Sequence, residues 1–281
     1  MGEWEEVSDG VLRRRYEPYD IGVCVVRASG GLLVVDTRAS ARQGGEILAD
    51  LARFGQPVRW VVNTHAHFDH TFGNQRFGPA SARPAPIYAH ARVPAHLERY
   101  EVPMLAAWRE GDEVSDSPTE EWREVVITAP TVLVDEHAVL DLGDREVELV
   151  HLGRGHTDND LLVHVRDAQV WLVGDLVEES GPPMYGTGSF PLEWPATVQA
   201  LVDRLTPGTV VVPGHGEVVD VAFTSTQQAQ LQCVADLIRE LHAGGVALLD
   251  AVATGGERWP FPLRGMASAV ADGYSHLALE A

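Results

Sequence analysis

Residues 63–70 of the chain read NTHAHFDH, and they follow directly after the apolar run at 60–62. Four potential metal ligands, His65, His67, Asp69 and His70, are therefore crowded together at the expected end of a strand. Imidazole nitrogens and carboxylate oxygens are the ligands that zinc and neighbouring transition metals favour. In an irregular loop His65 and His67 can turn towards one metal, while Asp69 and His70 suit a second metal beside it. This stretch predicts a metal site at a strand end.

Three later segments repeat this context of an apolar run, a glycine and a ligand-type residue. They are LGRGHTD at 152–158, VWLVGD at 170–175 and VVVPGHG at 210–216, which contribute His156, Asp175 and His215. Glycine allows the backbone to turn sharply where a strand ends. Loops at the carboxyl ends of strands in one sheet lie close together, however far apart they are in sequence. We therefore expect the four segments to converge on one site.

These motifs resemble those of the metallo-β-lactamase fold superfamily of metal-dependent hydrolases. The H-x-H-x-D-H run, the G-H-T motif, the G-D pair and the P-G-H-G motif stand in the family's order, over roughly residues 20–220. The resemblance implies an α/β (α+β) fold, a four-layer αββα sandwich with the metals at one edge between two facing sheets. We expect a single domain over 1–281, with C-terminal helices in 222–281. The irregular segment 101–124 is interpreted as an insertion, either a lid over the site or a surface excursion.

The family's residue roles carry over onto this sequence one by one. The resemblance implies a first metal held by His65, His67 and His156, a second held by Asp69, His70 and His215, and Asp175 bridging both. Asp36 matches the family's early aspartate, which is expected to orient a ligand histidine. Tyr185, in the loop 181–188, is the candidate substrate contact, with ordinary loop packing as the alternative. Among the remaining histidines only His96 is a further candidate, because the insertion beside it could fold over the pocket.

The implied cofactors are two divalent metal ions, expected to be Zn²⁺, with iron or manganese as alternatives. A water shared by the two ions would supply a bridging hydroxide as the nucleophile. Asp69 is the candidate catalytic residue, since it could orient that hydroxide and take its proton. The expected reaction is hydrolysis of an ester, thioester, lactone or amide bond in a small-molecule substrate.

Two alternative activities remain open at this point. A mononuclear iron persulfide dioxygenase also keeps an H-x-H-x-D-H run, and a β-lactamase would share the fold. Asp175 stands where class B1 β-lactamases carry cysteine, so the ligand set is closer to glyoxalase II and lactonases. A non-catalytic binding module is disfavoured because all seven ligand types are present.

Composition narrows the possible partners. The net charge of −20 predicts repulsion of nucleic acid and of anionic membrane surfaces. The sequence has no run of eighteen apolar residues, which a membrane-spanning helix would need. Its acidic first residues are unlike a secretory signal, so a cytoplasmic protein is expected. All 21 basic residues are arginine, which removes lysine-nucleophile chemistry. The two cysteines, Cys24 and Cys233, are interpreted as buried free thiols.

The periodicity of apolar residues predicts the main elements. Strands are expected at 11–16, 21–28, 32–36, 59–64 and 209–212. Shorter strands are expected at 86–89, 131–134, 138–142 and 146–151, and a hairpin at 161–165 and 168–173. Ser40 is expected to cap a helix that ends near Gly55. Pro195 suits the first turn of another helix, and helices are expected over 224–242 and 266–279.

Overall fold

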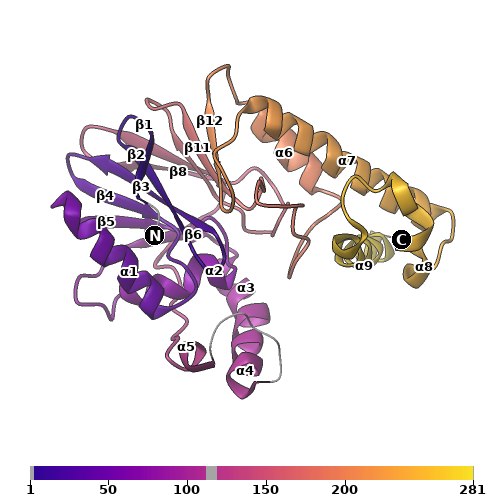
Figure 1. The fold of residues 1–281 in the computed structure, drawn as a ribbon, viewed down its shortest axis with the longest axis horizontal. Coiled ribbons are helices and arrows are strands. Elements are labelled where there is room, and N and C mark those ends of the chain that lie inside the picture. Colours follow the sequence, from indigo (N-terminus) through magenta and orange to yellow (C-terminus); the bar gives the residue numbers. More distant parts are fainter. Residues whose placement is uncertain (1–2, 112–118, 281) are drawn as a thin grey trace.

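A computed structural model describes residues 3–111 and 119–280 of the chain, and it has two facing β-sheets with helices on their outer sides (Figure 1). One sheet is seven-stranded, in the order β1 (Glu5–Ser8), β2 (Val11–Tyr16), β3 (Ile21–Ala28), β4 (Gly31–Val35), β5 (Val58–Val62), β6 (Ile87–His90) and β7 (Val132–Val134). The other is five-stranded, in the order β12 (Val210–Pro213), β11 (Val170–Gly174), β10 (Leu162–Val165), β9 (Glu146–Val150) and β8 (His137–Asp141). This arrangement confirms the predicted αββα sandwich.

Alternation along the strands builds the layers. In β3, Cys24 and Val26 join the core between the sheets, whereas Val23 and Val25 pack with the helix α1 (Ala41–Leu51) on the outer face. Successive side chains of a strand point to opposite faces, so a strand that is buried on both faces is apolar throughout. The outer face of the five-stranded sheet packs against α6 (Trp194–Val202) and α7 (Val221–Ala243).

Parallel pairing brings the ligand-bearing loops to one edge. β4 pairs in parallel with β5, and β11 pairs in parallel with β12. The two sheets meet at this edge, where the Gly22 N–H donates to the Gly214 carbonyl at 2.7 Å and Ile21 forms an isolated bridge with His215. The carboxyl ends of four strands therefore surround one site.

The predicted helix starts and ends are largely confirmed. α1 (Ala41–Leu51) begins after Ser40, whose side chain accepts the Gln43 N–H at 3.2 Å. A 3₁₀ turn (Ala52–Phe54) extends it, and Gly55 ends it in the left-handed conformation. α6 has Pro195 in its first turn, and α7 and α9 (Leu263–Glu280) cover the two predicted C-terminal helices. The helix α8 (Leu248–Gly255) was not predicted.

The segment 101–124 is more regular than the sequence indicated. Val102–Glu110 forms α4, which continues α3 (Val93–His96) through a π-helical turn, and Thr119–Arg123 forms α5. Trp122 is fully buried, in a cluster with Phe72 and Leu105. Residues 112–118, in the middle of the segment interpreted as a possible lid, lie outside the described residues.

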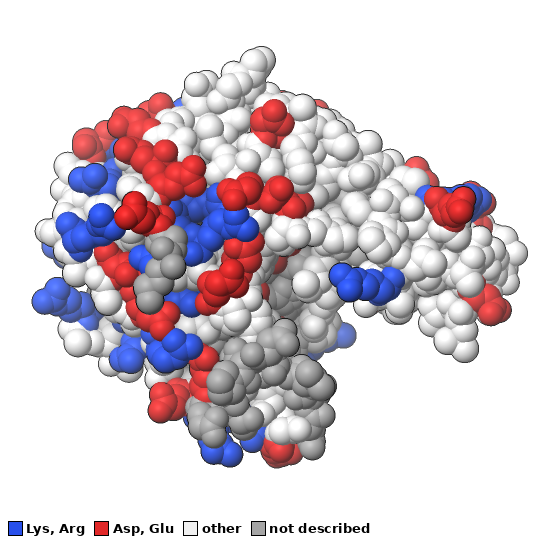
Figure 2. Space-filling model, in the orientation of Figure 1, with Lys and Arg blue, Asp and Glu red and all other residues white. Residues whose placement is uncertain are grey.

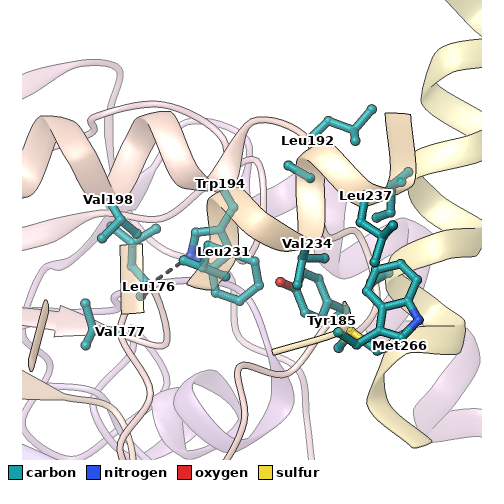
Figure 3. Close-up of a cluster of buried hydrophobic side chains, with 14 of the residues drawn as sticks. Leu176, Val177, Tyr185, Leu192, Trp194, Val198, Leu231, Val234, Leu237 and Met266 are labelled. Atoms are coloured by element: carbon teal, nitrogen blue, oxygen red, sulfur yellow. Dashed lines mark hydrogen bonds between the residues drawn. The ribbon is translucent and has the colours of Figure 1, made fainter. Parts of the chain in front are cut away.

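The C-terminal helices add a second apolar layer beyond α6. Figure 3 shows Tyr185, Leu237 and Met266 packed together beside Trp194, whose indole N–H donates to the Leu176 carbonyl at 3.0 Å. Cys24 is buried as predicted, but Cys233 is exposed on α7, so the prediction of a buried thiol is wrong there. The reason is that Cys233 lies on the side of α7 away from this core.

On the face shown in Figure 2, acidic side chains border the arginines over the strands and α1, while the C-terminal helices carry few charges. Among the described residues, no helix is both long enough and apolar enough to span a bilayer.

Candidate metal centre

The structure brings all seven predicted ligand-type side chains together at the edge where the sheets meet. His65 and His67 lie on the loop after β5, and the short helix α2 (Phe68–Thr71) carries Asp69 and His70. His156 lies on the loop after β9, Asp175 follows β11 and His215 follows β12. All are buried except His67 and His215, which are half-buried.

The first ligand set consists of His65, His67 and His156. The Nε2 atom of His65 is 3.1 Å from Nδ1 of His67, which is 2.8 Å from Nε2 of His156. Ligand atoms around a tetrahedral zinc ion lie about 3.3 Å apart, since each is about 2.0–2.1 Å from the ion. The three nitrogens are therefore spaced closely enough to share one ion.

The second set consists of Asp69, His70 and His215. The Nε2 atom of His215 is 3.4 Å from Nε2 of His70 and 3.6 Å from Oδ2 of Asp69. Asp175 lies between the sets: its Oδ2 is 3.6 Å from His156 Nε2 and 3.2 Å from His215 Nε2. Its Oδ1 is 3.3 Å from His70 Nε2. One carboxylate thus borders both groups of nitrogens.

Each histidine ring of the site has one nitrogen that faces the other candidate ligands and one that faces away. The hydrogen bonds of the nitrogens that face away indicate that the nitrogens facing the site carry lone pairs. His67 Nε2 donates to the Thr187 carbonyl at 3.0 Å, and His156 Nδ1 donates to the Met184 carbonyl at 3.1 Å. A carbonyl oxygen can only accept, so in the neutral rings His67 Nδ1 and His156 Nε2 face each other without a proton between them. His215 Nδ1 similarly donates to the Tyr19 carbonyl at 2.7 Å. Converging lone pairs in a buried site fit a bound cation.

Asp36 contacts two of the candidate ligand histidines, His70 directly and His65 through Thr64. Its Oδ2 accepts from His70 Nδ1 and from the Thr64 hydroxyl, each at 2.8 Å. The Thr64 hydroxyl is in turn 3.1 Å from His65 Nδ1. Asp36 has a φ of 65°, in the left-handed region that aspartate tolerates better than most residues. A single buried carboxylate therefore orients one histidine from each set.

The electrostatics of the site favour added positive charge. Burial lowers the pKa of His156 to about 3 and holds that of His65 well below its usual value, so both stay neutral. Burial also lowers the pKa of His215, but the carboxylates of Asp175 and Asp69 outweigh it and raise the pKa to about 10. Burial raises the pKa of Asp175, yet the imidazoles of His215, His70 and His65 hold it well below the usual range. Without a cation, protons on the second set would balance the carboxylate charge.

Two residues outside the motifs join the site. Thr64 was part of the quoted run, but its hydroxyl link between Asp36 and His65 was not predicted. Glu178 lies close enough to Asp175 and His215 to share an ion with them, and burial raises its pKa to about 7. Its only signal in the sequence is that it follows Asp175 by three positions and precedes a second glutamate, Glu179.

The candidate substrate contact Tyr185 is buried. Its side chain is 4% exposed and packs edge-on against Trp194, with the ring centroids 5.1 Å apart (Figure 3). The alternative of ordinary packing fits this position, because the ring joins the core under α6 and α7. This burial disfavours a direct contact with substrate.

Comparisons with known proteins agree with the fold. The sequence profile of the metallo-beta-lactamase superfamily matches residues 22–215, a span that contains Asp36 and all seven ligand-type residues. The chain is 27% identical over 238 residues to the acyl-coenzyme A thioesterase MBLAC2 of Homo sapiens, covering 76% of this chain and 81% of that protein. It is 26% identical over 203 residues to the metallo-beta-lactamase type 2 of Bacillus cereus, covering 70% and 67%.

Solved structures show the same fold. The metallo-beta-lactamase from Pontibacter korlensis has a TM-score of 0.64 at 20% identity, covering 83% of this chain and 99% of that one. The DIM-1 metallo-beta-lactamase has a TM-score of 0.63 at 17% identity, covering 82% and 97%. Because the family profile matches well over half of this chain, the chain belongs to the metallo-beta-lactamase superfamily.

Proposed function

We propose that this chain is a dinuclear metal-dependent hydrolase, with zinc as the expected metal, that cleaves an ester, thioester, lactone or amide bond. The position of Asp175 carries the proposal. Its carboxylate lies within 3.8 Å of ring nitrogens from both ligand sets, namely His65, His156, His70 and His215. A carboxylate that borders two sets of lone pairs is what a pair of adjacent ions needs as a common ligand. Membership of the superfamily supports a metal-dependent hydrolase.

The protein residues have distinct tasks in this proposal. His65, His67 and His156 would hold one ion, Asp69, His70 and His215 the other, and Asp175 both. Bound divalent ions would make a hydroxide available near neutral pH and polarise the bond to be cleaved. Asp69 reaches towards the second set, with its Oδ2 3.6 Å from His215 Nε2, and would orient the attacking water and accept its proton. Asp36 would keep the outward nitrogens of His70 and, through Thr64, His65 occupied.

An acyl thioester is the first substrate class to test. Acyl-coenzyme A thioesterases of Homo sapiens and Gallus gallus match 76% of this chain, a larger share than the B. cereus metallo-beta-lactamase does. Met184, whose carbonyl binds His156, has a side chain that is 68% exposed. An exposed apolar side chain on the segment that contacts His156 suits the acyl part of such a substrate better than a strongly charged one.

The test is a metal analysis combined with a panel of thioesters, esters, lactones and β-lactams, assayed with and without chelator. We expect about two zinc ions per chain, and activity that chelator removes and zinc restores. One iron per chain with oxygen consumption on persulfide would refute the proposal in favour of the dioxygenase alternative.

A pair of variants tests the ligand assignment. His67→Ala removes one of three nitrogens from the first set and should lower kcat/KM by about 10³-fold, since loss of several kcal/mol of metal stabilisation corresponds to tenfold per 1.36 kcal/mol. His137→Ala is the matched control, because His137 is an exposed histidine on β8. Full activity of His67→Ala would show that this set does not serve the reaction.

A further inference from the structure

A change of helix type lies beside the loop that carries His65 and His67, called the metal loop below. The π-helical turn η3 (Leu97–Glu101) joins α3 to α4, and the Val102 N–H donates to the Leu97 carbonyl five residues earlier. In an α-helix, side chains five residues apart point about 140° away from each other, because each residue turns the chain by about 100°. The wider turn brings them closer to one side, and π turns within helices are frequent at functional sites. Here His96 and Glu101 both face His67, with ligand-type atoms of the three within 4.8 Å of one another.

Both side chains are buried at a cost that packing alone does not explain. His96 is 4% exposed and Glu101 is 1% exposed. Among the described residues, His96 Nε2 and Glu101 Oε2 have no hydrogen-bond partner. Burial raises the pKa of Glu101 to about 7 and lowers that of His96 to about 4. Glutamate is almost never fully buried unless it is paired, and apolar residues would fill the same space at a lower cost.

The contacts of the pair lead to two different ligand loops. The backbone N–H of Phe68, the residue between His67 and Asp69, faces the Glu101 carboxylate. His96 Nδ1 accepts from the Asn159 side-chain amide at 3.2 Å. Asn159 is three residues after His156, and its backbone N–H donates to the Thr157 hydroxyl at 3.0 Å. With 3.7 Å between His96 Nε2 and Glu101 Oε1, the pair spans from the metal loop to the His156 loop.

A third segment closes over the pair. A Cβ atom on Gly188, whose φ is +77°, would come within 2.9 Å of His96 Cε1. The neighbouring Thr187 carbonyl accepts from His67 Nε2. The backbone at 187–188 therefore covers His96 on one side and holds His67 on the other. This cover leaves the pair out of reach of a substrate, so any role it has is exerted through other residues.

We propose that His96 and Glu101 are positioning residues that hold the loop of His67 against the loop of His156 and so set the geometry of the first ligand set. The short separation of 2.8 Å between His67 Nδ1 and His156 Nε2 is the feature that they would maintain. This inference rests on the proposed function, because it assumes that these two nitrogens share an ion. Residues that orient metal ligands in this way typically affect metal affinity by about 10–100-fold.

The test compares zinc affinity in the wild type, Glu101→Ala and Glu101→Gln by titration against a chromophoric chelator. Glu101→Ala should weaken one of the two zinc-binding steps by about 10–100-fold. It should also alter the absorption of the cobalt-substituted protein, which reports ligand geometry. Glu101→Gln keeps an oxygen for the Phe68 N–H and should stay close to the wild type. Glu98→Ala, an exposed glutamate on the same turn, is the matched control and should change neither readout.

Melting of the metal-free protein separates positioning from packing. If Glu101→Ala lowers the melting temperature while both zinc affinities and the cobalt spectrum stay unchanged, the pair only packs and the inference is wrong. Three ions per wild-type chain, with the third lost in Glu101→Ala, would also overturn it, because the pair would then be ligands themselves. Should Glu101→Ala not fold, His96→Gln decides the question by the same zinc titration, with unchanged affinities counting against the inference. A wild type that binds no metal would refute the proposed function as well.

Discussion

Replacing Asp36 with asparagine tests whether one buried carboxylate orients the metal ligands. The substitution keeps the size of the side chain and suits the left-handed backbone at φ 65°. An amide oxygen in the place of Oδ1 can still accept the Thr64 N–H, which lies at 2.8 Å. An amide nitrogen in the place of Oδ2 cannot accept from His70 Nδ1. The Thr64 hydroxyl can rotate to accept from the new amide, so the main loss is the carboxylate acceptor of His70 Nδ1.

The magnitude follows from that single lost bond. A buried donor without a partner costs about 1–3 kcal/mol, so the metal-free protein should melt about 2–12 °C lower at about 2–4 °C per kcal/mol. His70 can recover by moving its proton to Nε2, which removes the lone pair that faces His215. Zinc affinity at the second set should then fall by about 10–100-fold.

The assay is zinc titration of Asp36→Asn against a chromophoric chelator, together with thermal melting of the metal-free chain. Asp141→Asn, an exposed aspartate at the end of β8, is the control and should match the wild type in zinc affinity. Two zinc ions bound by Asp36→Asn at wild-type affinity would refute the reasoning, because the orientation of His70 would then be set elsewhere.

Two further outcomes are expected. A Cβ atom at Gly214 would lie 2.1 Å from Asp175 Oδ1, so Gly214→Ala should displace this carboxylate and lower the metal content per chain. The control is Gly265→Ala, which should retain both ions because nothing lies within 4 Å of a Cβ atom there. Equal metal content in the two variants would contradict this placement of Asp175. The folded-state pKa of His215, about 10, lies above its value of about 6.5 in an unfolded chain. The resulting stabilisation of the metal-free protein is full below pH 6.5 and is lost as the pH rises through about 10. Denaturant unfolding of the metal-free wild type and of His215→Gln across this range measures this loss of stability. The loss should be smaller in the variant but not absent, because neighbouring carboxylates outweigh burial and raise the pKa of His70 as well. A parallel pH dependence in both proteins would exclude His215 as a source.

The sequence predicted the centre of the molecule better than its periphery. Ligand-type residues after apolar runs, such as Asp175 after β11, were enough to expect convergence, because parallel strands end at a common edge. The cap at Ser40 was equally readable, since capping is a local interaction. The contacts of Glu101 were not readable, because they depend on a π turn and on a partner, Phe68, that is distant in sequence. Tyr185 shows the same limit, since its burial is set by packing against Trp194 and the C-terminal helices.

The division of the ligands between the sheets has a consequence for assembly. The seven-stranded sheet is built from residues up to Val134, and the five-stranded sheet begins at His137, so the chain falls into two consecutive halves. His65, His67, Asp69 and His70 belong to the first half, and His156, Asp175 and His215 to the second. Each proposed ion thus takes ligands from both halves of the chain and would cross-link them. Metal capture would then come after the two sheets have docked, and amide exchange along this seam should slow when zinc is added.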